Sequence, residues 1–162
     1  MRRSRLRILY RYYLLFIIIV GLWCGLAQAA GKRWVSRGTE GGEIAAMVAD
    51  PQNPSIVYAG GTGGNIFVST DGGAEWKRRG SLPVGVGLRL LAIDPQNTST
   101  LYAGTYNGIY KTTNGGTNWA EIINGLSSFV ISALSVDAQS PDTLYATSTG
   151  GDCSFFKSTA IR

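Results

Sequence analysis

An all-β fold is predicted by three features of the chain. Asp50, Asp94 and Asp137 are spaced 44 and 43 residues apart, and three Tyr-Ala pairs keep the same two spacings. Gly, Pro, Asp and Asn separate short apolar runs within each repeat, as turn residues do. No segment after the first 29 residues shows a sustained helical period. Four short strands in about 43 residues is the spacing of a propeller blade, so we predict a β-propeller-type array of about three four-stranded blades.

The first repeat shows how the strands are assigned. Ile44–Ala49 is mostly small and apolar, which is typical of a strand buried on both faces. Residues 56–59 and 66–70 carry β-branched and aromatic side chains and predict the second and third strands. The fourth strand is predicted at residues 76–79, after a tight Asp-Gly-Gly turn. The sequence therefore divides into repeats at about residues 43–87, 88–130 and 131–162.

The two ends of the array predict how it is completed. Trp34 precedes Asp50 at nearly the spacing that separates Trp76 from Asp94. Residues 33–42 are therefore expected to hold the fourth strand of a preceding or closing blade. Because propellers usually have at least four blades, we expect either a partial propeller or half of a ring that a second chain closes as a homodimer.

The first 29 residues are expected to be an export signal. Five arginines and no acid precede the apolar residues 12–26, and Ala27-Gln28-Ala29 has the small-x-small pattern that signal peptidase cleaves. This apolar stretch is shorter than the roughly 20 residues of a membrane span, and an uncleaved anchor is the alternative. The domain at 30–162 would be periplasmic or extracellular, without membrane attachment after cleavage. Cleavage would leave Cys153 as a lone thiol, unable to form an internal disulfide.

Charge and composition exclude several classes of function. The net charge of +5 comes from the five arginines of residues 1–29, because the remaining chain has ten basic and ten acidic residues. This balance argues against a nucleic-acid partner. The chain has no His, which removes the commonest zinc ligand and every Ser-His or Cys-His mechanism. We predict no metal and no cofactor, and we expect the basic residues 77–79 to form a solvated edge on an outermost strand.

Two segments share one eight-residue pattern, Ser-Thr-Asp-Gly-Gly-Ala-Glu-Trp from Ser69 and Thr-Thr-Asn-Gly-Gly-Thr-Asn-Trp from Thr112. Their glycines allow the positive φ of a tight turn. The Asp71 carboxylate can accept N–H groups of that turn, and Trp76 is expected to pack beside the next blade. Asn114 can accept the same bonds without charge. We predict a structural role, with no catalysis, for the positions of this pattern: Ser69, Asp71, Gly73, Trp76, Thr112, Asn114, Gly116 and Trp119.

This pattern resembles the Asp-box, or bacterial neuraminidase repeat, S-x-D-x-G-x-x-W. With its flanking Asp-Pro-Gln-Asn and Tyr-Ala-Gly phrases, the array is similar to several exported propeller families. These are photosystem II stability and assembly factors, sortilin-type receptors and xyloglucanase-type glycoside hydrolases. The resemblance covers about residues 33–159 and implies the fold without choosing among the families. It also implies that the box joins the third and fourth strands, on the face away from the ligand site.

The arginines and carboxylates favour binding over catalysis. A sialidase needs an arginine cluster around the substrate carboxylate, and the mature chain has six arginines that match no such motif. A glycosidase needs two carboxylates facing one cleft. Four of the ten acids belong to turns, and the other six show no paired arrangement. We therefore predict no catalytic residue and a scaffold that binds a protein or glycan. The alternative is a fragment of a carbohydrate-active propeller enzyme, xyloglucanase-like or sialidase-like.

The loops at one end of the predicted blades supply candidate binding residues. These loops join second strands to third strands and fourth strands to the next blade, and they are rich in Gly, Ser, Thr and Asn. The third repeat carries three extra residues within 147–154, and such a local insertion often marks a contact site. We expect the binding loops to include Tyr106, Asn107 and Asp152.

Overall fold

The structure is a computed structural model that describes residues 42–122, 130–149 and 155–159. All of these residues belong to one compact unit, Arg37–Arg162. The predicted signal at 1–29, nearly all of the strand predicted at 33–42, Asp152 and Cys153 lie outside the described residues. The described residues include no helix long and apolar enough to cross a membrane.

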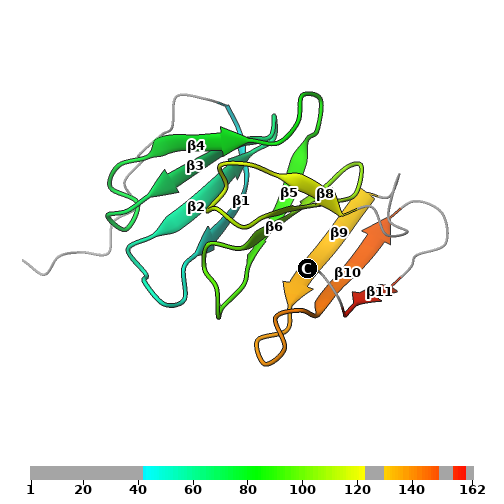
Figure 1. Cartoon of the computed structure of the whole chain (residues 1–162). Helices are drawn as coiled ribbons and strands as arrows, with labels where there is room; N and C mark the ends of the chain where they lie inside the picture. Colours follow the sequence, from blue (N-terminus) through cyan, green and yellow to red (C-terminus); the bar gives the residue numbers. More distant parts are fainter. Residues whose placement is uncertain (1–41, 123–129, 150–154, 160–162) are drawn as a thin grey trace, which may run out of the picture. The chain divides into compact units, whose positions relative to one another are not determined.

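Three antiparallel sheets make up the described chain, and in each the strands follow one another as a meander (Figure 1). The first sheet has the order β1-β2-β3-β4, with strands β1 (Ile44–Ala49), β2 (Val57–Gly61), β3 (Asn65–Ser69) and β4 (Lys77–Ser81). The second has the order β5-β6-β7-β8, with strands β5 (Leu88–Ile93), β6 (Leu101–Thr105), β7 (Ile109–Thr112) and β8 (Ala120–Ile122). The third has the order β11-β10-β9, with strands β9 (Val130–Val136), β10 (Leu144–Thr149) and β11 (Phe155–Ser158).

The predicted all-β array is confirmed by these sheets. In the first sheet, β1 has the predicted bounds, and β2, β3 and β4 begin or end within two residues of the predicted positions. The third sheet contains three strands among the described residues, whereas the first two contain four. The array therefore has the strand content predicted for successive blades.

The same irregularity recurs in the first strand of every sheet. The pairing of β5 with β6 skips Arg89, because Leu88 pairs with Thr105 and Leu90 with Gly104. The equivalent skip falls on Ala45 in β1 and on Ser132 in β9. A bulge bends its strand and redirects the extra side chain. These three positions, 44 and 43 residues apart, therefore present side chains that the regular alternation of a strand would not predict.

Adjacent sheets are joined by two hydrophobic clusters. In one cluster, Ile66 of the first sheet and Leu82, which directly follows β4, pack with Leu88 and Tyr110 of the second sheet. The other brings Tyr102 and Ile109 of the second sheet together with the third-sheet residues Ile131, Leu144 and Ala146. Burying these side chains removes apolar surface from water, which stabilises the folded state by about 25 cal/mol per Å² of buried apolar surface. The sheets are therefore held to one another mainly by packing.

Small residues in the second strands set how closely the sheets approach. A Cβ atom on Gly60 would lie 2.7 Å from Leu88 Cδ1 in the next sheet. A Cβ atom on Gly104 would lie 3.0 Å from Ile131 Cγ2 in the sheet after that. Gly60 and Gly104 are equivalent in the repeat, and so are Leu88 and Ile131. In both interfaces, therefore, a glycine of the second strand makes room for an aliphatic side chain from the first strand of the next sheet.

The prediction that β1 is buried on both faces is wrong. Ile44 is 36% exposed and Met47 is 57% exposed. At the positions equivalent to Ile44, Leu88 and Ile131 are 1% and 0% exposed, because the preceding sheet covers them. Among the described strands, β1 makes extensive contacts with β2 and β5 alone. The burial of a first strand therefore depends on a neighbour that its own sequence does not reveal.

Candidate functional site

The first box turn (residues 69–76) is organised by two side chains. The buried Ser69 hydroxyl donates to Asp71 Oδ1 at 2.7 Å and accepts the Gly73 N–H at 2.7 Å. Asp71 Oδ1 in turn accepts the Glu75 N–H at 2.9 Å. Gly72 and Gly73 have positive φ values of 71° and 92°, which favour glycine. These residues close a tight connection between β3 and β4.

The second box turn (residues 112–119) makes the same bonds with different residues. Thr112 Oγ1 donates to Asn114 Oδ1 at 2.8 Å and accepts the Gly116 N–H at 3.2 Å. Asn114 Oδ1 accepts the Asn118 N–H at 3.0 Å, as Asp71 accepts that of Glu75. Trp119 Nε1 donates to the Gly116 carbonyl at 3.1 Å. An amide oxygen therefore serves in this turn where the first turn uses a carboxylate.

The second box turn packs against the preceding sheet. A Cβ on Gly116 would lie 3.1 Å from Ile66 Cγ2, and one on Gly115 would lie 3.2 Å from the Tyr58 hydroxyl. Arg79 Nε donates to the Gly115 carbonyl at 3.2 Å, and Arg79 Nη2 donates to the Asn114 carbonyl at 3.3 Å. Arg79 is exposed, as expected for a solvated edge, and it also binds the box turn of the neighbouring sheet.

The pKa of Asp71 is held below its ordinary value, first by the Glu75 N–H and then by the Ser69 hydroxyl. Because the folded-state pKa is the lower one, the carboxylate stabilises the fold above the pKa of the unfolded state. That contribution is lost as the pH falls through the folded-state pKa. The turn is therefore expected to weaken in acid.

Replacing Asp71 with Asn tests this electrostatic contribution. We expect Asp71→Asn to unfold slightly below the wild-type temperature at neutral pH and to lose less stability in acid, because an amide makes the same bonds without the charge, as Asn114 does. Asp71→Ala should unfold at a lower temperature, since it leaves the turn N–H groups without an acceptor. Thermal unfolding at neutral and acid pH measures both effects. Equal losses in the Asn and Ala variants would show that the turn requires a charge.

Three further aspartates also accept hydrogen bonds from the backbone of their own turns. Asp50 Oδ1 accepts the N–H groups of Gln52 and Asn53, at 2.8 and 3.1 Å. Asp94 and Asp137 accept the equivalent N–H groups at distances between 2.8 and 3.2 Å. Within residues 42–122, 130–149 and 155–159, no three Cys, Asp or Glu side chains gather as metal ligands would.

The opposite end of the sheets presents Tyr106 on a rigid turn. We call this end, with the β2–β3, β4–β5 and β6–β7 connections, the loop end. The fully buried Thr105 hydroxyl donates to the Gly108 carbonyl at 2.8 Å and accepts the Asn107 N–H at 3.0 Å. Tyr106 is 55% exposed at the tip of this turn, and Asn107 is also exposed. The turn therefore offers a fixed aromatic ring to solvent.

Two residues of the β4–β5 region hold the Tyr106 ring. The Arg89 guanidinium carbon lies 5.1 Å from the ring centroid, which is a cation–π distance. A Cβ on Gly87 would lie 3.0 Å from Tyr106 Cδ2, so this glycine leaves room for the ring. The half-buried Arg89 makes no ion pair with a residue that the structure describes. Its guanidinium N–H groups are therefore available to a ligand at the loop end.

Sequence reasoning selected Tyr106 and Asn107 and placed Gly87 in a neighbouring loop of the same end, but it missed Arg89. Arg89 occupies the bulge position, where the other two repeats have Ala45 and Ser132. An alignment of the three repeats therefore contains the missed signal, one long cation among small residues. Asp152, the third candidate, lies outside the described residues.

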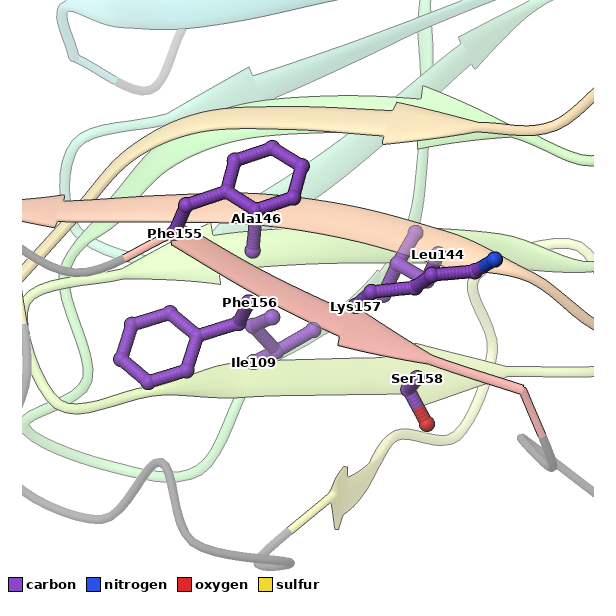
Figure 2. A pocket seen from close by; sticks show the side chains of 7 residues that line it. All are labelled: Ile109, Leu144, Ala146, Phe155, Phe156, Lys157 and Ser158. Carbon is purple, nitrogen blue, oxygen red and sulfur yellow. The ribbon is translucent and has the colours of Figure 1, made fainter.

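A hollow of about 320 Å³ lies between the second and third sheets, lined by Ile109, Leu144, Ala146 and β11 (Figure 2). Figure 2 shows Phe155 and Phe156 pointing to opposite sides of β11. Ile109 is the repeat equivalent of Ile66, on which Gly116 of the second box turn packs. By this equivalence the hollow lies on the surface of β7 that corresponds to the one the second box turn covers on β3. It is therefore a feature of the fold and not our candidate ligand site.

No protein-family model matches the sequence, and no curated protein matches it. Solved structures match in fold. A GH74 xyloglucanase from Xanthomonas campestris is 20% identical, with a TM-score of 0.60 over 73% of this chain and 20% of that chain. YCF48 from Cyanidioschyzon merolae is 13% identical, with a TM-score of 0.58 over 75% of this chain and 38% of that chain. The extracellular domain of BT4673 from B. thetaiotaomicron is 21% identical, with a TM-score of 0.53 over 78% of this chain and 17% of that chain.

These neighbours share a β-propeller fold and differ in function. One is an enzyme, and YCF48 has also been solved bound to D1 peptide. The chain spans only about a fifth of the xyloglucanase and 38% of YCF48. At these identities the likeness shows the fold alone, so it does not choose between catalysis and binding. The three sheets described here have the fold of part of a β-propeller.

Proposed function

We propose that the chain is an exported interaction scaffold that binds a protein or glycan at its loop end and has no catalysis of its own. The observation that carries this proposal is Tyr106, half exposed and fixed between Gly87 and Arg89. Tyr and Arg are enriched at binding sites because they combine apolar area with directed polar groups. A turn that is already rigid loses little conformational entropy when it binds.

Other observations support export and the choice of a binding partner. Residues 1–29 have the pattern of a signal peptide, which would place the domain in the periplasm or outside the cell. One neighbour in fold is an extracellular domain, and another binds a peptide. The matching bonds of the two box turns support assignment to the Asp-box group of propellers. The proposed function requires no metal or cofactor.

Substitutions at the loop end test this function. A random peptide display library is the first probe, and peptides selected on the full chain are then measured on Tyr106→Ala and Arg89→Gln. We expect each substitution to weaken binding by about tenfold or more, because residues of this kind dominate interface energies. Lys77→Ala, on the exposed outer strand β4, should bind as the wild type does. A glycan array serves as the second probe with the same variants.

Two outcomes would reject the loop end as the site. The first is binding that survives both substitutions, and the second is failure of every peptide and glycan to bind folded protein. The alternative function, a fragment of a carbohydrate-active enzyme, is favoured by the likeness to the GH74 xyloglucanase. Release of reducing ends from xyloglucan, above the level of heat-denatured protein, would favour that alternative.

A further inference from the structure

The two ends of the described array expose positions that the internal sheets bury against one another. We call the outer face of β10 and β11, with Tyr145, Thr147 and Phe155, the tail face. Phe155 pairs with Thr147 at the register position where Ile66 pairs with Gly60 and Ile109 with Gly104. Ile66 and Ile109 are 0% and 1% exposed, whereas Phe155 is 69% exposed. The tail face is therefore an interface position without a covering sheet among the described residues.

The head face, formed by Ile44, Met47 and the first box turn, is the matching surface at the other end. Leu88 and Ile131 are fully buried against the sheet before them, whereas their equivalent Ile44 is 36% exposed. Gly115 and Gly116 of the second box turn are buried against the preceding sheet, whereas a Cβ on Gly72 of the first turn would meet nothing within 4 Å. The head face thus carries the groups that would cover a tail face.

A side-chain hydrogen bond that recurs between adjacent sheets lacks an acceptor at the tail face among the described residues. Gln52 Nε2 donates to the Pro95 carbonyl of the next sheet at 2.9 Å, and Gln96 Nε2 donates to the Ala138 carbonyl at 3.2 Å. Gln139 is the third member of this series, and its side-chain amide makes no hydrogen bond with the residues that the structure describes. The carbonyl equivalent to those of Pro95 and Ala138 is that of the exposed Pro51.

The tail face has an apolar hollow. Its volume is about 210 Å³, and it is lined mainly by apolar atoms of Leu134, Tyr145, Ala146, Thr147 and Phe155. The Tyr145 and Phe155 rings stack with their centroids 6.0 Å apart, and both lie at this hollow. Apolar side chains that are open to water at such a hollow favour association.

We propose that the tail face binds the head face of a second copy of this chain. Ile44 of the second copy would lie against Thr147 as Leu88 lies against Gly60, and Gln139 would donate to the Pro51 carbonyl of that copy. Each copy carries one head and one tail, so two head-to-tail contacts can close a ring. Two copies of the three described sheets make six, which is within the usual range for a propeller. This association uses neither Tyr106 nor Arg89, so it is independent of binding at the loop end.

Thr147 limits how closely the second copy can approach. A Cβ at the equivalent Gly104 would lie 3.0 Å from Ile131 Cγ2, a distance that a shift of a few tenths of an ångström would relieve. Thr147 Oγ1 is also hydrogen bonded to Ser132 Oγ at 2.8 Å, which fixes its orientation. We therefore expect the contact between copies to be weaker than the contacts between sheets of one chain. Thr147→Gly should tighten it.

Disulfide trapping tests the pairing of specific residues. The full chain carries Ile44→Cys and Thr147→Cys in a background with Cys24→Ser and Cys153→Ser. In the equivalent pair within the chain, a Cβ on Gly60 would lie 3.3 Å from Leu88 Cγ. Two cysteines at such a pair of positions are close enough to form a disulfide, which needs Cβ atoms about 4 Å apart. We expect most of the oxidised protein to run as a covalent dimer. The control pair, Val84→Cys with Thr147→Cys, should remain largely uncrosslinked, because the fully exposed Val84 lies on the β4–β5 connection, whose Leu82 and Val86 pack between the first and second sheets and not on the head face.

Light scattering on the full chain measures the association without crosslinking. We expect a mass of twice the chain mass for the wild type, a mass of one chain for Phe155→Asp, and no change for Val84→Asp. Phe155 is mostly exposed in the single chain, so its substitution should leave the β-type circular dichroism intact. A wild-type monomer at every soluble concentration would overturn the proposal. So would an oligomer that Phe155→Asp leaves unchanged, or equal crosslinking of the two cysteine pairs.

Discussion

Replacing Gly80 with alanine is expected to destabilise the folded protein by about 3 kcal/mol, at the upper end of the cost of overpacking. The new Cβ would meet the Gly116 carbonyl oxygen and would lie 2.7 Å from the Thr117 carbonyl oxygen. Both atoms belong to the backbone of the second box turn, so no side chain can rotate away to relieve the contact. The sheets must separate locally, and the bonds from Arg79 to the turn would be strained. Urea unfolding followed by circular dichroism measures the loss.

Gly63→Ala is the matched control for this prediction. Gly63 is exposed on the β2–β3 turn, and a Cβ there would meet nothing within 4 Å. We expect its free energy of unfolding to stay within about 0.5 kcal/mol of the wild type. Equal stabilities of the two variants would mean that the second box turn does not pack on β4 in solution.

The repeat explains why so much of the fold could be predicted. Asp50, Asp94 and Asp137 each accept two N–H groups of their own turn, within three residues along the chain. Such bonds are encoded by local sequence, so the turns and the strands between them fall where the spacing places them. The glycines of the box turns are equally local in origin, because their positive φ values are imposed by the turn itself.

The features that could not be predicted depend on neighbours in space. Ile44 and Leu88 occupy the same position in the repeat, yet one is partly exposed and the other is buried, because only Leu88 has a preceding sheet against it. Arg79 is exposed, as its sequence setting predicts, but the sequence does not show that it donates to carbonyls of the neighbouring turn. Contacts between repeats therefore have to be seen in three dimensions, even where each repeat is assigned correctly.

The candidate site shows the same division. Tyr106 could be selected from sequence because an aromatic residue in a short polar loop has little core to enter. Its partner Arg89 was missed, because the β-bulge that turns its side chain toward the loop end breaks the simple alternation of a strand. The loop end therefore combines one residue that loop composition reveals with one whose direction the strand register explains.

Removing the side chain of Ile131 should be among the most damaging core substitutions. Ile131 is fully buried, lies at the small second-strand residue Gly104 and joins the second sheet to the third. We expect Ile131→Ala to lower the free energy of unfolding by about 3 to 4 kcal/mol, since it loses burial and leaves a cavity. Chemical unfolding at low protein concentration measures the loss. Because Ile131 lies between two sheets, we also expect lower cooperativity, with the third sheet opening first.

Ile44→Ala makes the same chemical change at the equivalent position of the first sheet. Because Ile44 is 36% exposed in the single chain, we expect a loss of less than about 1 kcal/mol at low protein concentration. If a second copy covers the head face, the free energy of unfolding of the wild type must rise with protein concentration. The difference in free energy of unfolding between the wild type and Ile44→Ala must then also increase with concentration. A gap that is the same at every concentration would show that Ile44 has no role in association. A loss at low concentration as large as that of Ile131→Ala would mean that part of the same chain already covers the head face.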